Sequence, residues 1–389
     1  MESSGNQQGI AVKINEDYCS RCCICSSVCP FEAIRRDPET GRMLLEIEKC
    51  QTCGICYSSC PAHAIDAIYY DVDSLIRYLE RAKQEYESDT LVIMCKGSAP
   101  DSGAVEKLFG VSEFVPLFVP CVGRIPEDVL LKAIATMGIR RTCVLACDED
   151  YCRFEKGSAM TGRRIMALNI LLEQLGYGKE AIELKRNSLK VKADRDKCIA
   201  CGNCAFYCPF DAAKLVSGAA EFDLDLCRGC GLCVTLCPAF ALDLENWETE
   251  RISALISRLS AEMDRPKILI FRCQWSVFPS LDGEFDSNVR AIDMPCAARV
   301  EPLHILEAFQ TGVEGILIAA CPEEDCKSKR GSKESQRLIT ALRKTLTQIG
   351  FEDRLHFCSV APRYPEAFGE ELRQFKARIE GNYLKEASQ

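Results

Sequence analysis

The sequence predicts a multidomain protein of α+β and α/β class, in which two small cysteine-rich modules alternate with two doubly wound parallel-sheet α/β domains. Three observations support this prediction: four similar cysteine runs, a long internal repeat, and short apolar strands that alternate with helical segments. The 389 residues are too many for one ordinary domain. We expect domains at residues 1–72, 73–188, 189–247 and 248–389.

One cysteine spacing, C-x-x-C-x-x-C-x-x-x-C-P, occurs four times. In paired runs of this kind three thiolates hold one [4Fe–4S] cubane, and the fourth thiolate completes the neighbouring cubane. Zinc motifs instead pair two C-x-x-C hooks with a spacer. The runs therefore predict four [4Fe–4S] sites: Cys19, Cys22, Cys25 and Cys60; Cys50, Cys53, Cys56 and Cys29; Cys198, Cys201, Cys204 and Cys237; Cys227, Cys230, Cys233 and Cys208.

The whole arrangement is a tandem duplication. Cys198 follows Cys19 by 179 residues, and Cys227 follows Cys50 by 177 residues. Four more cysteines follow each pair of runs, again at offsets between 174 and 179 residues. These two quartets are Cys95, Cys121, Cys147 and Cys152 in the first repeat, and Cys273, Cys296, Cys321 and Cys326 in the second. Each repeat is therefore a module with two cysteine runs, followed by a domain with one quartet.

The modules read as short strands separated by turns. Strands are expected at 11–19 and 43–50 in the first module and at 189–198 and 219–227 in the second. A short helical turn is expected after each Cys-Pro, at 31–34, 62–65, 210–213 and 239–242. About 60 residues bury too little apolar surface to be secure alone. We therefore expect metal binding to supply much of the folding free energy of each module.

The remaining segments predict two α/β domains. Apolar strands are expected at 91–95, 114–121, 142–147 and 181–186, and at 267–273, 289–296, 315–321 and 355–360. Helices are expected at 126–138, 158–176, 302–312 and 333–349, with linking helices at 73–87 and 246–263. Such alternation indicates a parallel sheet covered on both faces. Six of the quartet cysteines are the last residues of predicted strands. They should therefore lie at the carboxyl edge of the sheet, where these folds bind ligands.

The quartets allow three interpretations from the residues alone. Free cysteine is commonly buried as a small apolar side chain, so a structural role is one alternative. Four thiolates also suit a zinc ion. A [2Fe–2S] cluster takes four thiolates as well, and the recurrence of all four positions in both repeats favours a metal site.

Composition excludes several classes of function. The net charge of −9 argues against binding to nucleic acid, which depends on Lys and Arg contacts to phosphates. The amino terminus carries no secretory signal, and no apolar run approaches the roughly 20 residues that span a bilayer. We expect a cytoplasmic location without a membrane span. No glycine fingerprint for a dinucleotide is present, so no flavin is expected.

These motifs resemble two known families. The paired runs resemble bacterial two-cluster ferredoxins, in a context similar to the carboxy-terminal part of the A subunit of heterodisulfide reductase. The α/β domains resemble the delta subunit of methyl-viologen-reducing hydrogenase: residues 273–275 read Cys-Gln-Trp, residues 121–124 read Cys-Val-Gly-Arg, and both quartets end in a pair five residues apart. The first repeat has Cys-Lys-Gly at 95–97 instead of the tryptophan, and the second has Cys-Ala-Ala-Arg at 296–299 instead of the glycine.

The resemblance implies a [2Fe–2S] cluster in each quartet, and a protein that relays electrons between redox partners without substrate chemistry of its own. The implied partners are a hydrogenase, a formate dehydrogenase, a quinone-linked complex or a flavin-bearing heterodisulfide-reductase-like subunit, which would place the chain in the cytoplasm or peripheral to a membrane. Two alternatives stay open. One is a disulfide or thiol reductase with a reactive strand-end cysteine; the other is a zinc-organised scaffold.

Three cysteines and three histidines fall outside these sites. Cys143 and Cys358 lie in apolar strand segments and are expected in the core. Cys23 lies between two predicted ligands and is interpreted as a spectator, because the register of the run favours Cys22. His63, His304 and His356 lack partners with a ligand-like spacing.

Overall fold

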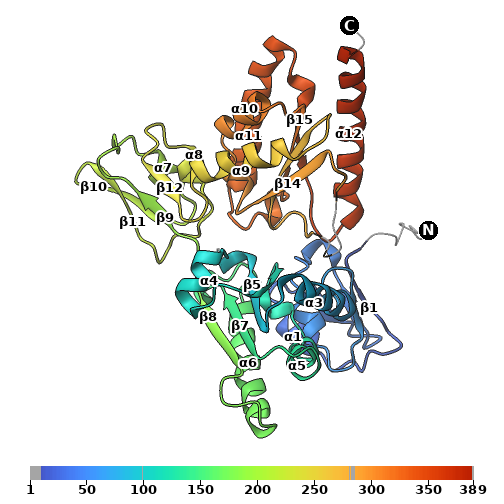
Figure 1. Ribbon diagram of the computed structural model, residues 1–389. Coiled ribbons are helices and arrows are strands. Elements are labelled where there is room, and N and C mark those ends of the chain that lie inside the picture. The colour runs from blue at the N-terminus through green and yellow to red at the C-terminus, as the bar shows by residue number, and fades with distance from the viewer. Residues whose placement is uncertain (1–9, 99, 280, 282–284, 388–389) are drawn as a thin grey trace. The chain divides into compact units, whose positions relative to one another are not determined.

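A computed structural model describes residues 10–98, 100–279, 281 and 285–387. The chain divides into two compact units. Unit 1 comprises Met1–Ser188 with Pro279–Gly283, and unit 2 comprises Leu189–Phe278 with Glu284–Gln389. Each unit contains a small cysteine-rich module followed by an α/β domain, as the colour sequence along the chain shows (Figure 1).

Two antiparallel strand pairs and two short helices form each module. In unit 1 the elements are β1 (Val12–Ile14), α1 (Ile24–Val28), β2 (Ile34–Arg36), β3 (Met43–Leu45), α2 (Ile55–Ser58) and β4 (Ile65–Ala67). In unit 2 they are β9 (Val191–Ala193), α7 (Asn203–Tyr207), β10 (Ala213–Val216), β11 (Ala219–Phe222), α8 (Leu232–Thr235) and β12 (Leu242–Leu244). The first strand pairs with the last in both modules, as β1 with β4 and β9 with β12.

The helical turns predicted after each Cys-Pro were wrong. The chain makes a turn there and then enters β2, β4, β10 or β12. The physical reason is pairing: each of these segments is extended because it forms an antiparallel ladder with another strand of its module. Tertiary pairing overrides the weak local preference of a four-residue segment.

Thiols make up much of the interior of the first module. Apolar residues from its strands, among them Val12, Ile34 and Ile65, pack in one cluster with buried Cys25, Cys50 and Cys56. A module of this size would otherwise have a very small core. That the module depends for its stability on what its cysteines bind stays a prediction.

Each α/β domain contains a four-stranded parallel sheet, as the sequence predicted. The strands of unit 1 are β5 (Thr90–Cys95), β6 (Val115–Val119), β7 (Arg141–Ala146) and β8 (Ile182–Arg186). Those of unit 2 are β13 (Ile268–Cys273), β14 (Val289–Met294), β15 (Gly315–Ala320) and β16 (Leu355–Ser359). The strand orders, β6-β5-β7-β8 and β14-β13-β15-β16, are equivalent. Both are doubly wound, and the chain direction across the sheet switches between β5 and β7, or between β13 and β15.

Six helices of the two domains follow predicted segments, whereas those at 102–109 and 365–387 were not predicted. In unit 1 the helices are α3 (Val72–Tyr86), α4 (Ser102–Phe109), α5 (Glu127–Thr136) and α6 (Gly157–Gln174). In unit 2 they are α9 (Thr249–Ala261), α10 (Pro302–Gln310), α11 (Gly331–Leu346) and α12 (Pro365–Ala387). Short 3-10 helices are η1 (Ile47–Lys49), η2 (Lys96–Ser98), η3 (Val122–Arg124), η4 (Glu149–Tyr151), η5 (Ala297–Arg299), η6 (Glu323–Asp325), η7 (Thr347–Ile349) and η8 (Glu352–Arg354).

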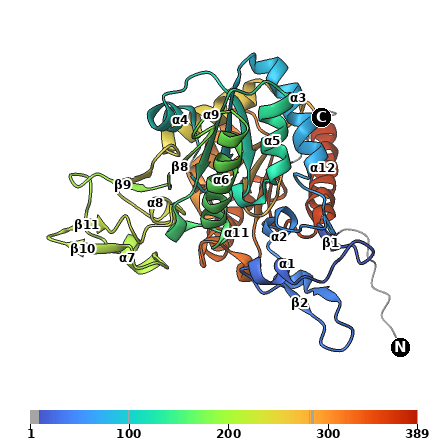
Figure 2. The same ribbon diagram turned by 90° about the horizontal axis from the view of Figure 1, so that it is seen from below.

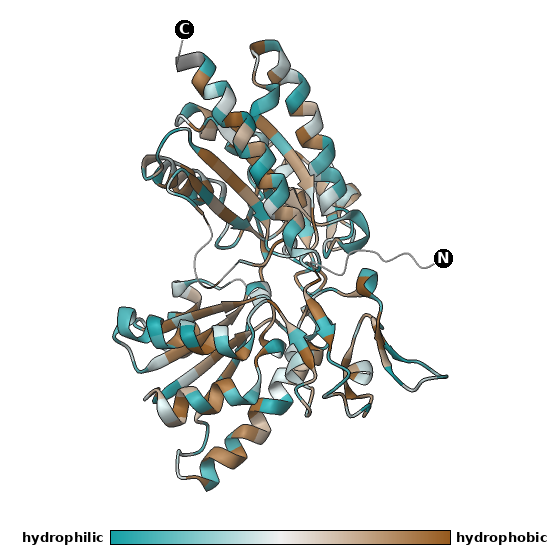
Figure 3. Cartoon of the chain, turned by 90° about the vertical axis from the view of Figure 1, so that its right-hand side faces the viewer, coloured by the Kyte–Doolittle hydropathy of each residue, from teal (hydrophilic) through white to brown (hydrophobic). Residues whose placement is uncertain are grey.

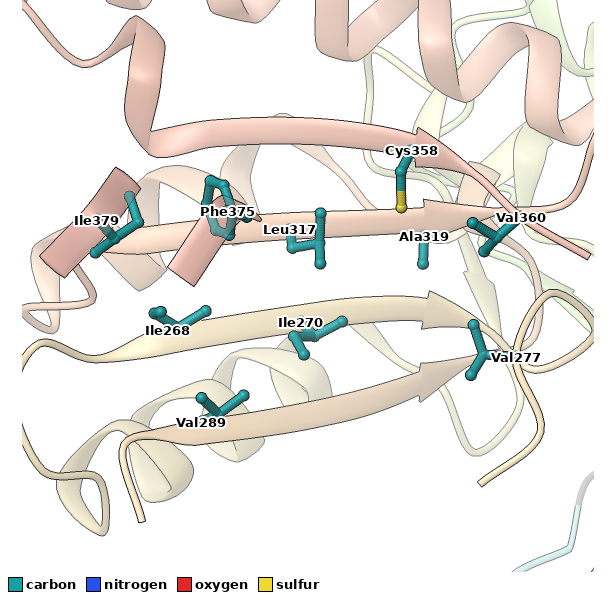
Figure 4. Close-up of a cluster of buried hydrophobic side chains, with 10 residues drawn as sticks. All are labelled: Ile268, Ile270, Val277, Val289, Leu317, Ala319, Cys358, Val360, Phe375 and Ile379. Atoms are coloured by element: carbon teal, nitrogen blue, oxygen red, sulfur yellow. The ribbon is translucent and has the colours of Figure 1, made fainter. Parts of the chain in front are cut away.

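Both faces of each sheet are covered. In unit 1, α4 covers the face that carries Val92 and Leu145, and α5 and α6 lie on the other side of the strands (Figure 2). In unit 2 the equivalent face is covered by α12, which packs Phe375 and Ile379 against Leu317 and its neighbours (Figure 4). The strands of both sheets are coloured as apolar along most of their length (Figure 3).

The strand ends were predicted almost correctly. Cys95 and Cys273 are the last residues of their strands, whereas Cys147 and Cys321 follow theirs directly. Cys121 and Cys296 lie two residues beyond strand ends and immediately precede the 3-10 helices η3 and η5. All of them therefore lie at the carboxyl edge of a sheet, and the sequence erred only in extending the strands too far. Among the described residues, no helix is long and apolar enough to cross a bilayer.

Candidate metal centres

The loops of the unit 1 module bring its eight run cysteines into two groups. Burial raises the pKa of the Cys25 thiol to about 11, and the nearby Cys19, Cys60 and Cys22 thiolates add to this rise. We call Cys19, Cys22, Cys25 and Cys60 the outer group of unit 1, because Cys22 is exposed to solvent.

The other four thiols of this module lie deeper. Burial raises the pKa of Cys53 to about 12, and the Cys50 and Cys29 thiolates contribute in the same direction. Burial likewise raises the pKa of Cys56, with contributions from Cys53, Cys50, Cys29 and Cys25. Cys29, Cys50, Cys53 and Cys56 form the inner group of unit 1. The fourth cysteine of each run thus lies with the other run, as the predicted ligand sets require.

The unit 2 module repeats this arrangement around two small cavities. The outer group lines one cavity and consists of Cys198, Cys201, Cys204 and Cys237. The inner group lines the other and consists of Cys208, Cys227, Cys230 and Cys233. Cys201, like Cys22, is exposed, whereas burial raises the pKa of Cys233 well above its usual value.

Backbone amides point at several of these sulfurs. The N–H groups of Ala64 and Ala241 donate to Cys60 Sγ at 3.3 Å and to Cys237 Sγ at 3.4 Å. Ala33 donates in the same way to Cys29 Sγ, at 3.4 Å. Each donor lies four residues after its cysteine, where the chain turns past the Cys-Pro into a strand. Hydrogen bonds to ligand sulfurs stabilise negative charge and are a means of tuning a cluster's potential.

The sheet edge of unit 1 brings its quartet together. Hydrogen bonds between side chains join Cys95 to Cys147, Cys147 to Cys152, and Cys152 to Cys121. Hydrogen bonds from Cys121 and Cys147 lower the pKa of the Cys152 thiol to about 3. These hydrogen bonds link the four side chains as successive neighbours, although 57 residues separate the first from the last.

The quartet of unit 2 converges in the same manner. Cys321 Sγ lies 3.7 Å from Cys273 Sγ, and side-chain hydrogen bonds join Cys273 to Cys296 and Cys296 to Cys326. Hydrogen bonding with Cys273, together with burial, raises the pKa of Cys296 to about 12. Both quartets lie where the strand order reverses, which is the ligand-binding position of doubly wound sheets.

Two glycines that sequence reasoning missed form part of these edges. A Cβ atom at Gly157 would lie 2.3 Å from Cys121 Sγ, and one at Gly331 would lie 2.4 Å from Cys296 Sγ. These glycines begin α6 and α11. The residues that follow them, Ser158 and Ser332, donate their N–H groups to Cys152 Sγ and Cys326 Sγ, both at 3.4 Å. A search for glycines at the 174-residue offset could have found both positions.

The inner group and the quartet are neighbours within each unit. The Cys53 thiolate lies close enough to raise the pKa of Cys121. In unit 2, buried Cys230 and Cys296 belong to one packed cluster. A side-chain hydroxyl also joins the inner loop to the quartet turn: Ser58 Oγ donates to Gly123 O at 2.8 Å. Each unit therefore has the order outer group, inner group, quartet.

The donor sets fit iron–sulfur clusters. Each set offers four thiols, and soft thiolate ligands suit iron–sulfur clusters or zinc. Within the described ranges, no group of three or more His, Cys, Asp or Glu side chains has the geometry for a single metal ion.

The remaining cysteines and histidines lie elsewhere. Cys143 and Cys358 are buried in apolar clusters of the two sheets. Cys23 Sγ donates to Arg21 O at 3.6 Å and lies 4.0 Å from Met43 Sδ, so the structure gives it contacts of its own. The three histidines have other surroundings: His63 is exposed, His304 Nδ1 accepts from Glu301 N, and His356 Nε2 lies 2.9 Å from Glu371 Oε2.

Comparison with known proteins supports the two-part organisation of each unit. Residues 92–199 and 268–381 match the family described as "Methyl-viologen-reducing hydrogenase, delta subunit". Residues 11–61 and 190–238 match the "4Fe-4S dicluster domain" family. The first match covers the two sheets with their quartets, and the second covers the cysteine runs.

Similar curated proteins fall into the same two groups. The A subunit of the ferredoxin:CoB-CoM heterodisulfide reductase of Methanosarcina mazei is 27% identical over 311 residues, which are 77% of this chain and 37% of that protein. The iron-sulfur D subunit of the F420-non-reducing hydrogenase of Archaeoglobus profundus is 29% identical over 121 residues, 29% of this chain and 88% of that protein. The corresponding vhc D subunit of Methanococcus voltae is 33% identical over 98 residues, 24% of this chain and 68% of that protein.

The chain spans about a third of the length of the heterodisulfide reductase relatives that it matches. The delta-subunit family covers more than half of the chain, in two copies at equivalent places in the two units. The dicluster matches account for the four cysteine runs and support [4Fe–4S] clusters there. The chain therefore belongs to the family of methyl-viologen-reducing hydrogenase delta subunits, as a duplicated form in which each delta domain follows a 4Fe-4S dicluster domain.

Proposed function

We propose that the chain is an iron–sulfur electron-transfer subunit that relays electrons between partner redox proteins in a heterodisulfide-reductase-like or hydrogenase-like complex. The observation that carries this proposal is the row of three thiol groups in each unit, with an exposed thiol at one end. When bound, the clusters would supply one-electron carriers at these places. The cysteines would hold them, and burial of the inner groups and quartets would exclude water.

The proposed ligands are the 24 cysteines of the four run groups and the two quartets. The run groups would each hold a [4Fe–4S] cluster, and the quartets would each hold a [2Fe–2S] cluster. Three observations support the quartet assignment: hydrogen bonds link the four thiols, they lie at the switch point of the sheet, and a glycine leaves room beside one sulfur in each unit. That the chain itself binds no flavin stays a prediction.

Electrons would enter and leave at the exposed thiols, Cys22 in unit 1 and Cys201 in unit 2. The surroundings of these two thiols differ. Exposed apolar side chains flank the outer group of unit 2: Ile199, Phe206 and Phe240. The matching positions of unit 1 carry exposed polar side chains, Ser20, Ser27 and His63, and the exposed apolar side chains of unit 1 lie at other positions, Tyr18 and Ile24. We infer that the two ends receive different partners, drawn from a hydrogenase, a formate dehydrogenase, a quinone-linked complex and a flavin-bearing subunit.

The test is a relay assay under anaerobic conditions. Tagged holoprotein captures its partners from native extract, and the captured donor and acceptor are then separated and recombined with or without the holoprotein. We expect the donor to reduce the acceptor only when the holoprotein is present, and Cys201→Ser to slow this transfer. Equal transfer without the holoprotein would contradict the proposal. Turnover of a disulfide by the purified chain alone would favour the reductase alternative.

A further inference from the structure

Each unit buries one arginine between its quartet and its inner group. Arg124 ends η3, three residues after Cys121, and Arg299 ends η5, three residues after Cys296. Both side chains are fully buried. Burying a charge is expensive unless the surroundings compensate for it. The recurrence of this costly residue at the same place in both units therefore calls for an explanation.

The two arginines also contact equivalent parts of the inner loops. A Cβ atom at Gly54 would lie 2.7 Å from Arg124 Cβ, and one at Gly231 would lie 2.5 Å from Arg299 Cδ. Both glycines have positive φ and lie between two inner-group cysteines. Any side chain at these positions would displace the arginine. The loops thus leave room for a cation next to the proposed cluster ligands.

The neighbours of the Arg124 charge include carbonyl oxygens, an aromatic ring and thiols. Its guanidinium donates to the carbonyl oxygens of Thr52, at 3.5 Å, and Tyr69, and it lies 4.8 Å from the ring centre of Tyr70. Thr52 itself lies between Cys50 and Cys53 in the inner loop. Burial lowers the pKa of Arg124, and the thiolates of Cys53 and Cys121 oppose this change.

The charge of Arg299 lies among carboxylates. Its Nη1 donates to Glu301 Oε1 at 2.6 Å, and its Nη2 lies 3.4 Å from Asp243 Oδ1. Nη2 also donates to Trp247 O at 2.9 Å and to Thr249 Oγ1 at 3.0 Å. Glu301 lies two residues after Arg299, where unit 1 has Pro126 two residues after Arg124. Unit 2 therefore has the nearer carboxylate, and unit 1 has a neutral residue at the equivalent position.

We propose that Arg124 and Arg299 tune the reduction potentials of the inner-group and quartet centres beside them, and that Glu301 offsets the effect of Arg299 in unit 2. This inference rests on the proposed function. Reduction adds one electron, supplied by a partner redox protein, to a buried centre. A buried cation favours that added negative charge, whereas a carboxylate paired with the cation offsets the effect. Loss of the arginine should therefore lower the potentials of the centres beside it, whereas loss of the carboxylate should raise them.

A purely structural role would have different consequences. If the arginines only fasten the inner loop to the sheet edge, removing the charge of Glu301 would change stability but would not shift a potential in a defined direction. A tuning role predicts opposite shifts when the cation is removed and when its carboxylate partner is removed. The pair Glu301 and Pro126 allows this test, because each unit supplies the residue to be placed in the other.

The experiment is an EPR-monitored redox titration of the full-length holoprotein. In a Cys147→Ser background the remaining binuclear signal belongs to unit 2, and in a Cys321→Ser background it belongs to unit 1. We expect Glu301→Gln to shift the redox equilibrium of the unit 2 centre toward the reduced form at least tenfold. For one electron this raises the reduction potential by about 59 mV. The amide oxygen of glutamine can still accept the hydrogen bond that caps α10.

The reciprocal variants are made in unit 1. Arg124→Gln and Pro126→Glu should each disfavour reduction of the unit 1 centre at least tenfold, whereas Arg124→Lys, which keeps the charge, should stay near the wild-type potential. Potentials that do not move in Glu301→Gln and Arg124→Gln, or equal shifts in Arg124→Gln and Arg124→Lys, would overturn the inference. Iron analysis of each variant separates this failure from failure of the proposed function, which would appear as missing iron in the wild type.

Discussion

Adding one methyl group at Gly157 should abolish the quartet site of unit 1. The new Cβ would lie 2.3 Å from Cys121 Sγ. Non-bonded carbon contacts are about 3.5–4.0 Å, so the sulfur would have to retreat by roughly 1.2 Å or more. Metal–ligand distances tolerate deviations of only about 0.2 Å. We therefore expect Gly157→Ala to lose about 2 of about 20 iron atoms per chain and one binuclear EPR signal.

Matched glycine substitutions control for a general effect on folding. A Cβ at Gly103 in α4 would meet Asp101 Oδ1 at 3.7 Å, which is an ordinary contact, so Gly103→Ala should keep all its iron. In unit 2, Gly331→Ala should remove the other binuclear signal, whereas Gly369→Ala, whose Cβ would have nothing within 4 Å, should not. A Gly157→Ala protein with full iron content and an unchanged spectrum would refute the reasoning.

Three further predictions concern single side chains. Cys147→Ser or Cys321→Ser should each remove one binuclear EPR signal and spare the cubane signals; loss of cubane signals alone would contradict the ligand sets. Cys143→Ala and Cys358→Ala should keep full iron content by elemental analysis, because these thiols are buried in apolar clusters; iron loss would make them ligands. Burial lowers the pKa of His304 to about 3, so the unfolded chain binds a proton below about pH 6.5 that the folded chain does not. Wild type should therefore lose thermal stability relative to His304→Val as the pH falls from 7.5 to 5.5, and parallel melting curves would contradict this.

The sequence predicted the sheets and the cysteine groups because both depend on strong local signals. A short, continuous apolar run such as residues 315–320 is buried on both faces. At this length it is typical of a strand in a parallel sheet that is covered on both sides. The cysteine runs fix three ligands within one short loop. The duplication then supplied an independent check, since every strand of one sheet has a counterpart in the other.

Other features were missed in the sequence. A local signal for α12 was present, because Phe368, Leu372, Phe375 and Ile379 follow a helical spacing and pack against one core cluster, but the helix was not predicted. Its role as cover for a sheet face appears only when the sheet exists. The strands after each Cys-Pro were mistaken for helical turns, since their pairing partners lie up to about 50 residues away in the sequence.

The charged surroundings of the sites were also beyond local reading. Arg124 was visible as part of a motif, but its burial against the inner loop depends on Gly54, which lies 70 residues earlier. The contrast between Glu301 and Pro126 becomes meaningful only once Arg299 and Arg124 are known to be buried.

The count of iron atoms per chain tests the central claim most directly. Full-length protein isolated without oxygen should contain about 20 iron atoms, about 16 in the four run groups and about 4 in the two quartets, with matching sulfide. About 16 iron atoms with no binuclear signal would remove the quartets from the relay. A colourless protein rich in zinc and without iron would contradict the whole account.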